Sequence, residues 1–313
     1  MRPDPRPVAT PRRPLLKRLA RTLVAPDAFD FWASRLNPIW SLDRPLARIV
    51  ARTAESSDTW TLTLQPNRHW RGFRPGQHLN VSAEIDGTRI TRSYSLSDAP
   101  RTDGRIAITV KAMPGGKLSQ HLCHAANIGD VLDLGPAFGE MTLPDKTRGA
   151  WLFLAAGSGI APLMAMIRAQ AAQCMPMPIA LAYWARTRDE LCFVDELRAL
   201  AARQPNFRVD IALTRDDDAA DVRYGRIDAS LLSAFAPDLH QRRVFACGPD
   251  GFVAAARALT AERAVAFHAE AFTPPPRVDV EGGSVQLTLA ASNRVLTVPR
   301  GESLLSALEA AGL

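Results

Sequence analysis

Short runs of strand-forming residues dominate the chain between Arg44 and about Leu143. Residues 60–64, 78–85 and 105–110 are rich in aliphatic residues and threonine, and Gly, Pro, Asp and Asn separate them. Runs of this length between turn-forming residues are typical of antiparallel sheets. The pattern therefore predicts an antiparallel barrel or sandwich.

The pattern changes at Ala150. From there, apolar runs alternate with Ala- and Leu-rich stretches of helical character; the runs are 151–155, 179–184, 207–213, 244–246 and 265–269. Such alternation predicts a parallel sheet with helices. Residues 150–167 carry no charge over a length that could span a membrane. However, Gly157, Gly159 and Pro162 interrupt this stretch, so a buried strand, a turn and a new helix are favoured.

A run of three prolines at 274–276 indicates a stiff linker. Beyond it, the pattern predicts two short strands at 284–289 and 294–298 and a helix that starts near Ser303. So few elements can bury little apolar surface, so we expect the residues beyond about 278 to be poorly packed.

The composition is that of a folded globular protein, with 47% hydrophobic and 22% charged residues. The net charge of +6 comes from one end, because residues 1–25 hold seven basic residues and one acidic residue, and the rest hold 31 of each sign. Without a basic, aromatic-lined folded face, nucleic acid is not an expected partner. The leader at 1–40 is either solvated or, through an amphipathic helix at about 15–24, a contact with an anionic membrane surface.

The cysteines predict neither disulfides nor a metal centre. Their spacing is irregular and contains no C-x-x-C; the four are Cys123, Cys174, Cys192 and Cys247. No pattern typical of an export signal is present near the N-terminus. We therefore expect a protein of the reducing cytoplasm.

The first chemical motif is Arg92-Ser93-Tyr94-Ser95 on a predicted strand. Alternate side chains of a strand share a face, so Arg92 and Tyr94 can contact one ligand while Ser95 approaches beside them. An arginine suits a phosphate and a tyrosine offers a flat face, which are the needs of a flavin nucleotide. Alone, these residues are equally typical of an ordinary strand.

The second motif follows a strand that ends at Val110-Lys111. The glycine-rich turn after it includes Gly116 and opens a helix that carries Ser119. Helix N-termini present free backbone N–H groups to anions, and a serine hydroxyl can add a donor or cap the turn locally. Together with the first motif, the turn favours a dinucleotide flavin over a mononucleotide.

Two further glycine turns lie at strand-to-helix junctions of the α/β half. One holds Gly157, Ser158, Gly159 and Pro162, and the other is Cys247-Gly248-Pro249. Junctions of this kind commonly bind ligand phosphates in parallel sheets. The first is neither a G-x-G-x-x-G fingerprint nor a nucleophile elbow. By itself, Cys247 is equally typical of a buried core thiol.

The order of these four motifs resembles the ferredoxin–NADP reductase superfamily, particularly its bacterial oxygenase- and desaturase-reductase branch, over about residues 44–272. The resemblance implies a Greek-key barrel that binds FAD, followed by a parallel α/β domain that binds NAD(P). It also implies that Arg92 binds the flavin phosphate, Tyr94 covers the isoalloxazine ring and Ser95 stands near its N5.

By the same resemblance, the FAD pyrophosphate is held by Gly116 and Ser119, with Val110 and Lys111 beside it. The residues that take the nicotinamide dinucleotide are Gly157, Ser158, Gly159 and Pro162, with Cys247, Gly248 and Pro249 bordering the nicotinamide. Glu270 and Phe272 match an E-x-F ending near the flavin. Ser95 and Cys247 are the candidates that tune hydride transfer. The implied divisions are a leader (1–40), an FAD domain (41–146), an NAD(P) domain (147–272), a linker (273–277) and an incomplete ferredoxin-like segment (278–313).

Arg186 and Arg188 follow the second predicted strand of the α/β half, where the adenosine ribose sits in such folds. No acidic residue directly ends that strand to bind a ribose 2′-hydroxyl, and either arginine could hold a 2′-phosphate. NADPH is therefore the expected donor over NADH, although both arginines could instead be solvated.

Residues 278–313 resemble the opening of a plant-type 2Fe-2S ferredoxin domain. Such domains ligate the cluster with four cysteines, and no cysteine follows Cys247. This chain is therefore not expected to bind that cluster, either because the sequence is truncated before the ligand loop or because the loop was lost naturally.

The predicted function is an NAD(P)H-dependent FAD reductase that passes electrons to an iron–sulfur protein serving a membrane desaturase or an oxygenase. The basic leader slightly favours the desaturase over an aromatic-ring oxygenase. Two alternatives stay open, a non-catalytic flavin-binding electron-transfer or regulatory subunit and a membrane-docked interaction protein. The first would not oxidise NAD(P)H, and the second would bind anionic vesicles without flavin.

Overall fold

The computed structural model describes residues 26–144, 149–216, 222–272, 282–290 and 292–312. The chain forms two compact units, Met1–Phe272 and Thr273–Leu313. The predicted helix at 15–24 and the proline-rich linker lie outside the described residues.

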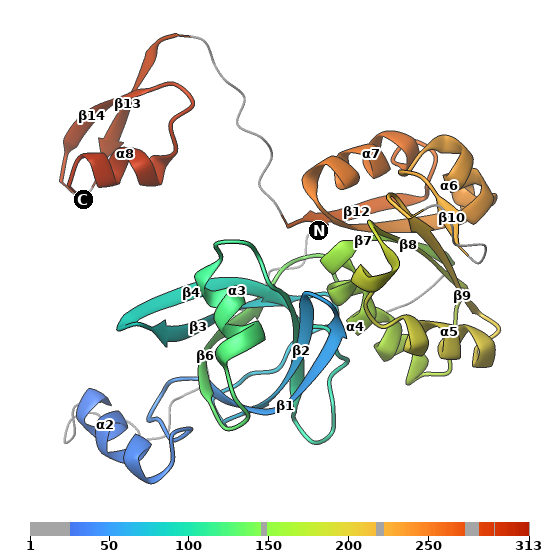
Figure 1. Ribbon diagram of the computed structural model, residues 1–313. Helices are drawn as coiled ribbons and strands as arrows, with labels where there is room; N and C mark the ends of the chain where they lie inside the picture. The colour runs from blue at the N-terminus through green and yellow to red at the C-terminus, as the bar shows by residue number, and fades with distance from the viewer. Residues whose placement is uncertain (1–25, 145–148, 217–221, 273–281, 291, 313) are drawn as a thin grey trace, which may run out of the picture. The chain divides into compact units, whose positions relative to one another are not determined.

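The first part of the larger unit is an antiparallel six-stranded sheet (Figure 1). Its strands are β1 (Leu46–Ser56), β2 (Thr59–Pro66), β3 (His78–Ile85), β4 (Thr88–Ser95), β5 (Ile106–Lys111) and β6 (Val131–Phe138). The order is β4-β3-β6-β1-β2-β5, in which β6 pairs between β3 and β1 as in a Greek key. A bridge between Leu96 and Ile108 joins the two edges of the sheet, so it closes into the predicted barrel.

A short helical segment packs on the barrel core. It consists of α3 (Lys117–Gln120) followed by the π-helical turn η1 (His121–Ala125). Leu118 and Leu122 are buried in the barrel core. Their burial anchors the helix that follows the glycine-rich turn, so the position of that turn depends on the core.

The second part is a parallel six-stranded sheet in the order β10-β9-β8-β7-β11-β12. The strands are β7 (Ala150–Ala156), β8 (Ile179–Ala185), β9 (Phe207–Leu213), β10 (Arg223–Tyr224), β11 (Arg242–Gly248) and β12 (Ala266–Ala271). Its helices are α4 (Ile160–Ala171), α5 (Val194–Arg203), α6 (Ala229–Phe235) and α7 (Asp250–Thr260), with short turns η2 (Gly157–Gly159), η3 (Arg188–Glu190) and η4 (Leu239–Gln241). The parallel α/β prediction is confirmed.

Helices cover both faces of this sheet, because both faces of its central strands are apolar. On β7, Trp151 and Phe153 pack in one cluster with α4 and α5, and Leu152 and Leu154 pack in another with α6 and α7. A strand buried on both faces must be apolar throughout. That requirement explains the uncharged stretch that resembled a membrane span, which is β7, η2 and the start of α4 as predicted. None of the described helices is long and apolar enough to cross a membrane.

A helix that the sequence pattern did not predict precedes the barrel. This helix, α2 (Pro26–Leu36), is held by Asp30, whose carboxylate accepts hydrogen bonds from Ser41 Oγ and Leu42 N, each at 2.8 Å. The end of the predicted leader therefore packs on the barrel.

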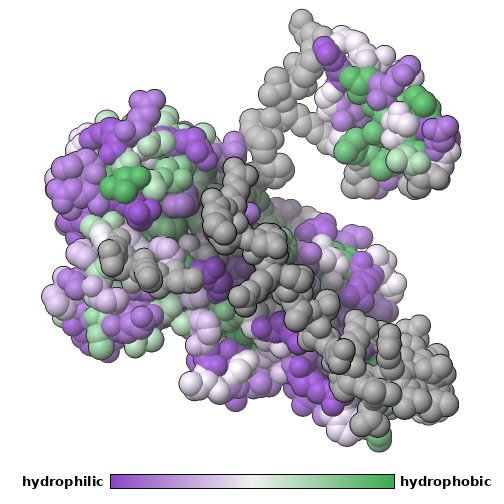
Figure 2. Space-filling model, turned by 180° about the vertical axis from the view of Figure 1, so that it is seen from behind, coloured by the Kyte–Doolittle hydropathy of each residue, from purple (hydrophilic) through white to green (hydrophobic). Residues whose placement is uncertain are grey.

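The smaller unit contains β13 (Ser284–Leu289), β14 (Arg294–Pro299) and α8 (Leu304–Ala310). The helix starts beside Ser303 as expected, and Ser303 caps it. Among its described residues, only Val298 and Ala307 are buried, and Val285, Val295 and Leu304 are exposed. Figure 2 shows hydrophobic residues on the surface of this unit. The expectation of weak packing is confirmed.

We predict that the amides of β13 and β14 exchange with solvent at least about a hundredfold faster than those of β7 and β8, because exchange from a strand with few buried contacts needs only local opening. Hydrogen exchange measured by mass spectrometry on the full chain tests this. Equal protection in the two sheets would contradict the weak packing.

Candidate active site

The strand motif and the glycine-rich turn meet on the barrel, because α3 packs against β3 and β4. Arg92 is exposed there. Tyr94 is half-buried against the barrel core, and burial raises the pKa of its hydroxyl. Ser95 is buried at the end of the strand. The fold thus presents a cation, a ring and a small hydroxyl along one segment beside a helix start.

The turn before α3 is held by its own hydrogen bonds. Ser119 Oγ accepts from Met113 N and donates to Gly116 O, both at 3.1 Å, and Gly115 has a φ of +73°. A Cβ atom on Gly116 would overlap Ser119 Oγ. Ser119 therefore holds the turn before α3 in shape and does not cap the helix, whose N-terminus has no side-chain cap. Val110 is fully buried, so its side chain faces the core.

The two glycine turns of the α/β half are in direct contact. A Cβ atom on Gly159 would overlap the carbonyl oxygen of Cys247, and one on Gly248 would come 2.9 Å from the Cβ of Ala156. The turns follow β7 and β11, which are neighbours, while β8 and β9 lie on the other side of β7. After β7, the chain adds strands on one side of β7 and then crosses over to place β11 on the other side. Ligands of parallel α/β sheets bind at the point where the strand order reverses in this way.

The helix starts at this point fit a bound diphosphate. The N-termini of α4 and α7 lack a side-chain cap, whereas α6 is capped by Asp228 and α8 by Ser303. Uncapped backbone N–H groups are what a dinucleotide pyrophosphate needs. Gly157 (φ +54°) has open space where a Cβ atom would stand, Ser158 is half-buried, and Pro162 is buried in the first turn of α4.

A chain of neighbouring residues joins the barrel motif to the α/β motif. Ser95 is paired with His78 across β4 and β3, and His78 Nδ1 lies 3.0 Å from Glu270 Oε1. Glu270 is paired with Cys247 across β12 and β11. At the end of β12, Phe272 N donates to Gly248 O at 3.0 Å, and its ring is partly exposed. The predicted flavin-side serine and nicotinamide-side cysteine are therefore linked through two contacting residues.

Burial raises the pKa of the Cys247 thiol well above its usual range, and the Glu270 carboxylate acts in the same direction. A thiol in this state is neutral at physiological pH. Cys247 thus offers the site a small, uncharged side chain and not a thiolate nucleophile.

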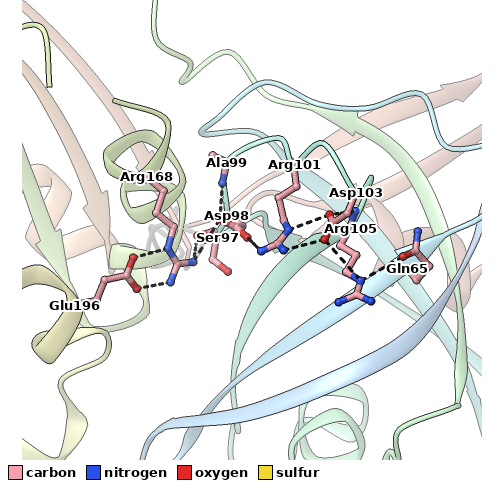
Figure 3. A network of polar contacts seen from close by, with 9 residues as sticks. All are labelled: Gln65, Ser97, Asp98, Ala99, Arg101, Asp103, Arg105, Arg168 and Glu196. Carbon is pink, nitrogen blue, oxygen red and sulfur yellow. Dashed lines mark hydrogen bonds and ion pairs between the residues drawn. The ribbon is translucent and has the colours of Figure 1, made fainter. Parts of the chain in front are cut away.

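Arg168 is a second link, which sequence patterns did not reveal. Its Nη1 donates to Ser97 O at 2.8 Å, and its other nitrogens form a two-pronged contact with Glu196 at 2.9 and 2.6 Å (Figure 3). A planar guanidinium held at both oxygens of a carboxylate has a defined orientation. It fixes α4 and α5 to the loop that follows Ser95.

A charged cluster surrounds the predicted ribose-phosphate site. Lys111 Nζ lies 3.0 Å from Asp58 Oδ2 and 3.3 Å from Glu190 Oε2, and Arg186 Nε lies 2.7 Å from Glu190 Oε1. Arg188 is exposed in η3. Although no acidic residue directly ends β8, the fold therefore brings Glu190 to Arg186. Their spacing of four residues is a weak signal for this pair.

The sequence matches two domain families in tandem. The oxidoreductase FAD-binding domain matches residues 46–142, and the oxidoreductase NAD-binding domain matches residues 153–258. Among relatives, an "NADPH oxidoreductase" of Mycobacterium tuberculosis is 31% identical over 304 residues, which cover 95% of this chain and 78% of the relative. A "glycine betaine monooxygenase reductase subunit" of Pseudomonas aeruginosa is 31% identical over 260 residues, or 78% and 70% of the two chains.

Solved structures share the fold. A cytochrome P450 reductase of Amycolatopsis superposes with a TM-score of 0.63 at 25% identity over 74% of this chain and 70% of that one. Phthalate dioxygenase reductase superposes with a TM-score of 0.60 at 23% identity over 86% and 80%.

The fold, the glycine turns and the matched domains define an oxidoreductase that uses FAD and a nicotinamide dinucleotide. The chain belongs to the ferredoxin–NADP reductase family.

We predict that Gly159→Ala raises the KM for NADPH about tenfold and lowers Tm, because the added methyl group overlaps the backbone at Cys247 and overpacking costs about 1–3 kcal/mol. Steady-state kinetics and thermal unfolding measure both effects. Ala199→Ser, on the exposed side of α5, is the matched control for one added heavy atom away from both turns. Unchanged KM and Tm in Gly159→Ala would show that neither nucleotide binding nor stability depends on the close contact between the two turns.

Proposed function

We propose that this protein takes a hydride from NADPH onto FAD and passes single electrons to an iron–sulfur protein that serves a membrane desaturase or an oxygenase. The observation that carries the proposal is the linkage of Ser95 to Cys247 through His78 and Glu270. It brings the barrel motif and the α/β motif to one place, where a flavin and a nicotinamide must meet.

In the barrel, Arg92 holds the flavin phosphate, Tyr94 covers the ring and Ser95 stands at its reactive edge. The pyrophosphate lies at the turn that contains Gly116, with Ser119 keeping the turn in shape and Lys111 at its side. Val110 contributes only backbone to this site because its side chain is in the core. When bound, FAD accepts a hydride and releases electrons one at a time.

In the α/β half, the turn with Gly157, Ser158, Gly159 and Pro162 holds the nicotinamide dinucleotide pyrophosphate. Cys247, Gly248 and Pro249 would border the nicotinamide, and the partly exposed Phe272 would lie near the flavin. The neutral Cys247 thiol fills space at this position without adding charge. Arg186 and Arg188 bind the 2′-phosphate, Arg186 by exchanging part of its contact with Glu190.

The proposed acceptor is an iron–sulfur protein. Several relatives are named as monooxygenase components, among them the "glycine betaine monooxygenase reductase subunit" and "methane monooxygenase component C" of Methylosinus trichosporium. Residues 278–313 hold no cysteine, so they offer no thiolate ligands for a plant-type cluster.

We also place the reductase in the cytoplasm, at the membrane surface. Its four cysteines are free, as suits a reducing compartment. The seven basic residues of 1–25 would attract the leader to anionic lipid. This contact would bring the reductase close to a membrane desaturase.

Purified protein loaded with FAD should be yellow, and anaerobic NADPH should bleach its visible absorption. Adding a plant-type 2Fe-2S ferredoxin should then stimulate cytochrome c reduction. A protein that stays colourless after incubation with excess FAD would refute the flavin assignment. A flavoprotein that neither nucleotide bleaches would instead be a non-catalytic subunit.

Arg92→Ala should weaken FAD binding about 10- to 100-fold, because a charge-assisted hydrogen bond contributes about 1.5–3 kcal/mol. Flavin fluorescence titration of the apoprotein measures this affinity. Arg89→Ala is the matched control, since Arg89 is exposed on the opposite face of the same strand. Equal affinities for FAD in the two variants would show that Arg92 does not bind the flavin phosphate.

Arg186→Ala should raise the KM for NADPH about tenfold or more and leave the KM for NADH within about twofold, because only NADPH loses a charge-assisted contact. Arg203→Ala, at the exposed end of α5, controls for the loss of a positive charge. A parallel rise in both KM values for Arg186→Ala would mean that Arg186 acts on a part common to both nucleotides.

A further inference from the structure

Helix α2 is amphipathic in the reverse of the usual sense. Its polar side faces the barrel: Asp30 accepts hydrogen bonds from Ser41 and Leu42, and Asn37, which follows the helix, accepts one from Arg48 Nη2 at 2.7 Å. Among the apolar residues at 28–36, whose side chains the structure describes, only Ala33 is buried. A surface helix normally buries its apolar stripe.

The outward side of α2 carries the large apolar residues. Phe29, Trp32 and Leu36 are three and four residues apart and therefore share one row of the helix. Trp32 is 68% exposed and Leu36 80%, and in the adjacent row Phe31 is 53% exposed. Figure 1 shows α2 beside the barrel, and no described element covers these side chains.

The apolar surface continues from the helix onto the barrel. A hollow beside α2 is lined by Phe29, Ile39, Trp40, Ser41, Pro66, Asn67, Arg68 and His69. Trp40 is 53% exposed at its border. We call the exposed set of Phe29, Phe31, Trp32, Leu36 and Trp40 the aromatic face.

Basic residues flank this face, while α2 itself also carries Asp27 and Asp30. Arg35 lies on the same side of α2, with its guanidinium 4.9 Å from the centre of the Phe31 ring. Residues 1–25, directly before the helix, hold seven basic residues and one acidic residue. Aromatic residues beside basic ones suit the interface of an anionic bilayer, where rings enter the boundary region and cations meet lipid phosphates.

We propose that the aromatic face inserts into the surface of an anionic membrane and docks the reductase there. The hydrogen bonds of Asp30 and Asn37 hold the helix against the barrel, so its apolar side is presented outward before any lipid is met. This proposal rests on the membrane contact proposed above for the leader and adds a folded apolar surface to its charge. Assays with soluble dyes test the reductase activity separately, so failure of one proposal can be told from failure of the other.

The test compares binding to phosphatidylcholine vesicles with and without about one-third phosphatidylserine, using the full chain loaded with FAD. Trp32→Ala/Leu36→Ala should lower the partition coefficient on the anionic vesicles at least about thirtyfold, because two large side chains no longer leave water. Ile128→Ala/Val265→Ala, which removes exposed apolar side chains elsewhere, should change it less than about twofold. NADPH oxidation with a dye should be the same in all variants.

A conservative variant separates insertion from a general loss of structure. Trp32→Phe should keep vesicle binding but lose part of the tryptophan quenching that brominated lipids cause. Wild-type binding by Trp32→Ala/Leu36→Ala would show that the leader acts by charge alone and would overturn the proposal. So would a wild-type dimer that this variant converts to a monomer without a change in vesicle binding, because a second copy would then cover the face.

Discussion

The contact between the barrel and the parallel sheet is the constraint on which the site depends. Hydride transfer requires two ring systems to lie face to face with their reacting atoms about 3–3.5 Å apart, yet each ring would be held by a different half of the unit. His78 and Glu270 bridge the halves at 3.0 Å beside the motifs, and Arg168 bridges them at Ser97. Both bridges are only partly exposed, so water competes with them less than at the surface.

The value of these bridges is geometric more than energetic. A charged group that is partly buried regains in its contacts much of what its desolvation costs, so the net contribution of such a contact to stability is small. The constraint that such a contact places on side-chain orientation is strong. Arg168 contacts both oxygens of Glu196 while donating to a backbone carbonyl, which leaves the guanidinium one orientation. The loop after Ser95 is therefore positioned by a residue from the other half.

Glu190 would compete with a nucleotide 2′-phosphate for Arg186. It holds both Lys111 and Arg186, one from the barrel and one from the end of β8. A 2′-phosphate bound by Arg186 would have to share the guanidinium with this carboxylate. If Arg186 binds the nucleotide as proposed, the affinity for the nucleotide would depend on the contact between the two halves, because Lys111 and Arg186 share Glu190.

Several features were predictable because they depend on residues close in the chain. The alternation at 60–64 and the apolar run at 151–155 predicted the right strand types, since the period of hydrophobic residues follows from strand geometry. The two small strands and the helix that starts near Ser303 were predictable for the same reason. The helix α2 was not, because its apolar residues face outward and so give no sign of a buried stripe.

The sequence by itself determined the chemistry available: which turns carry glycines, which strand carries Arg92 and Tyr94, and in what order the motifs follow. These are properties of local backbone conformation, which glycines and side-chain alternation encode over a few residues. Tertiary structure alone decided which of them meet. His78, Arg168 and Glu190 contact partners from distant segments, and such pairings depend on how two packed cores close against each other, which no short stretch of sequence encodes.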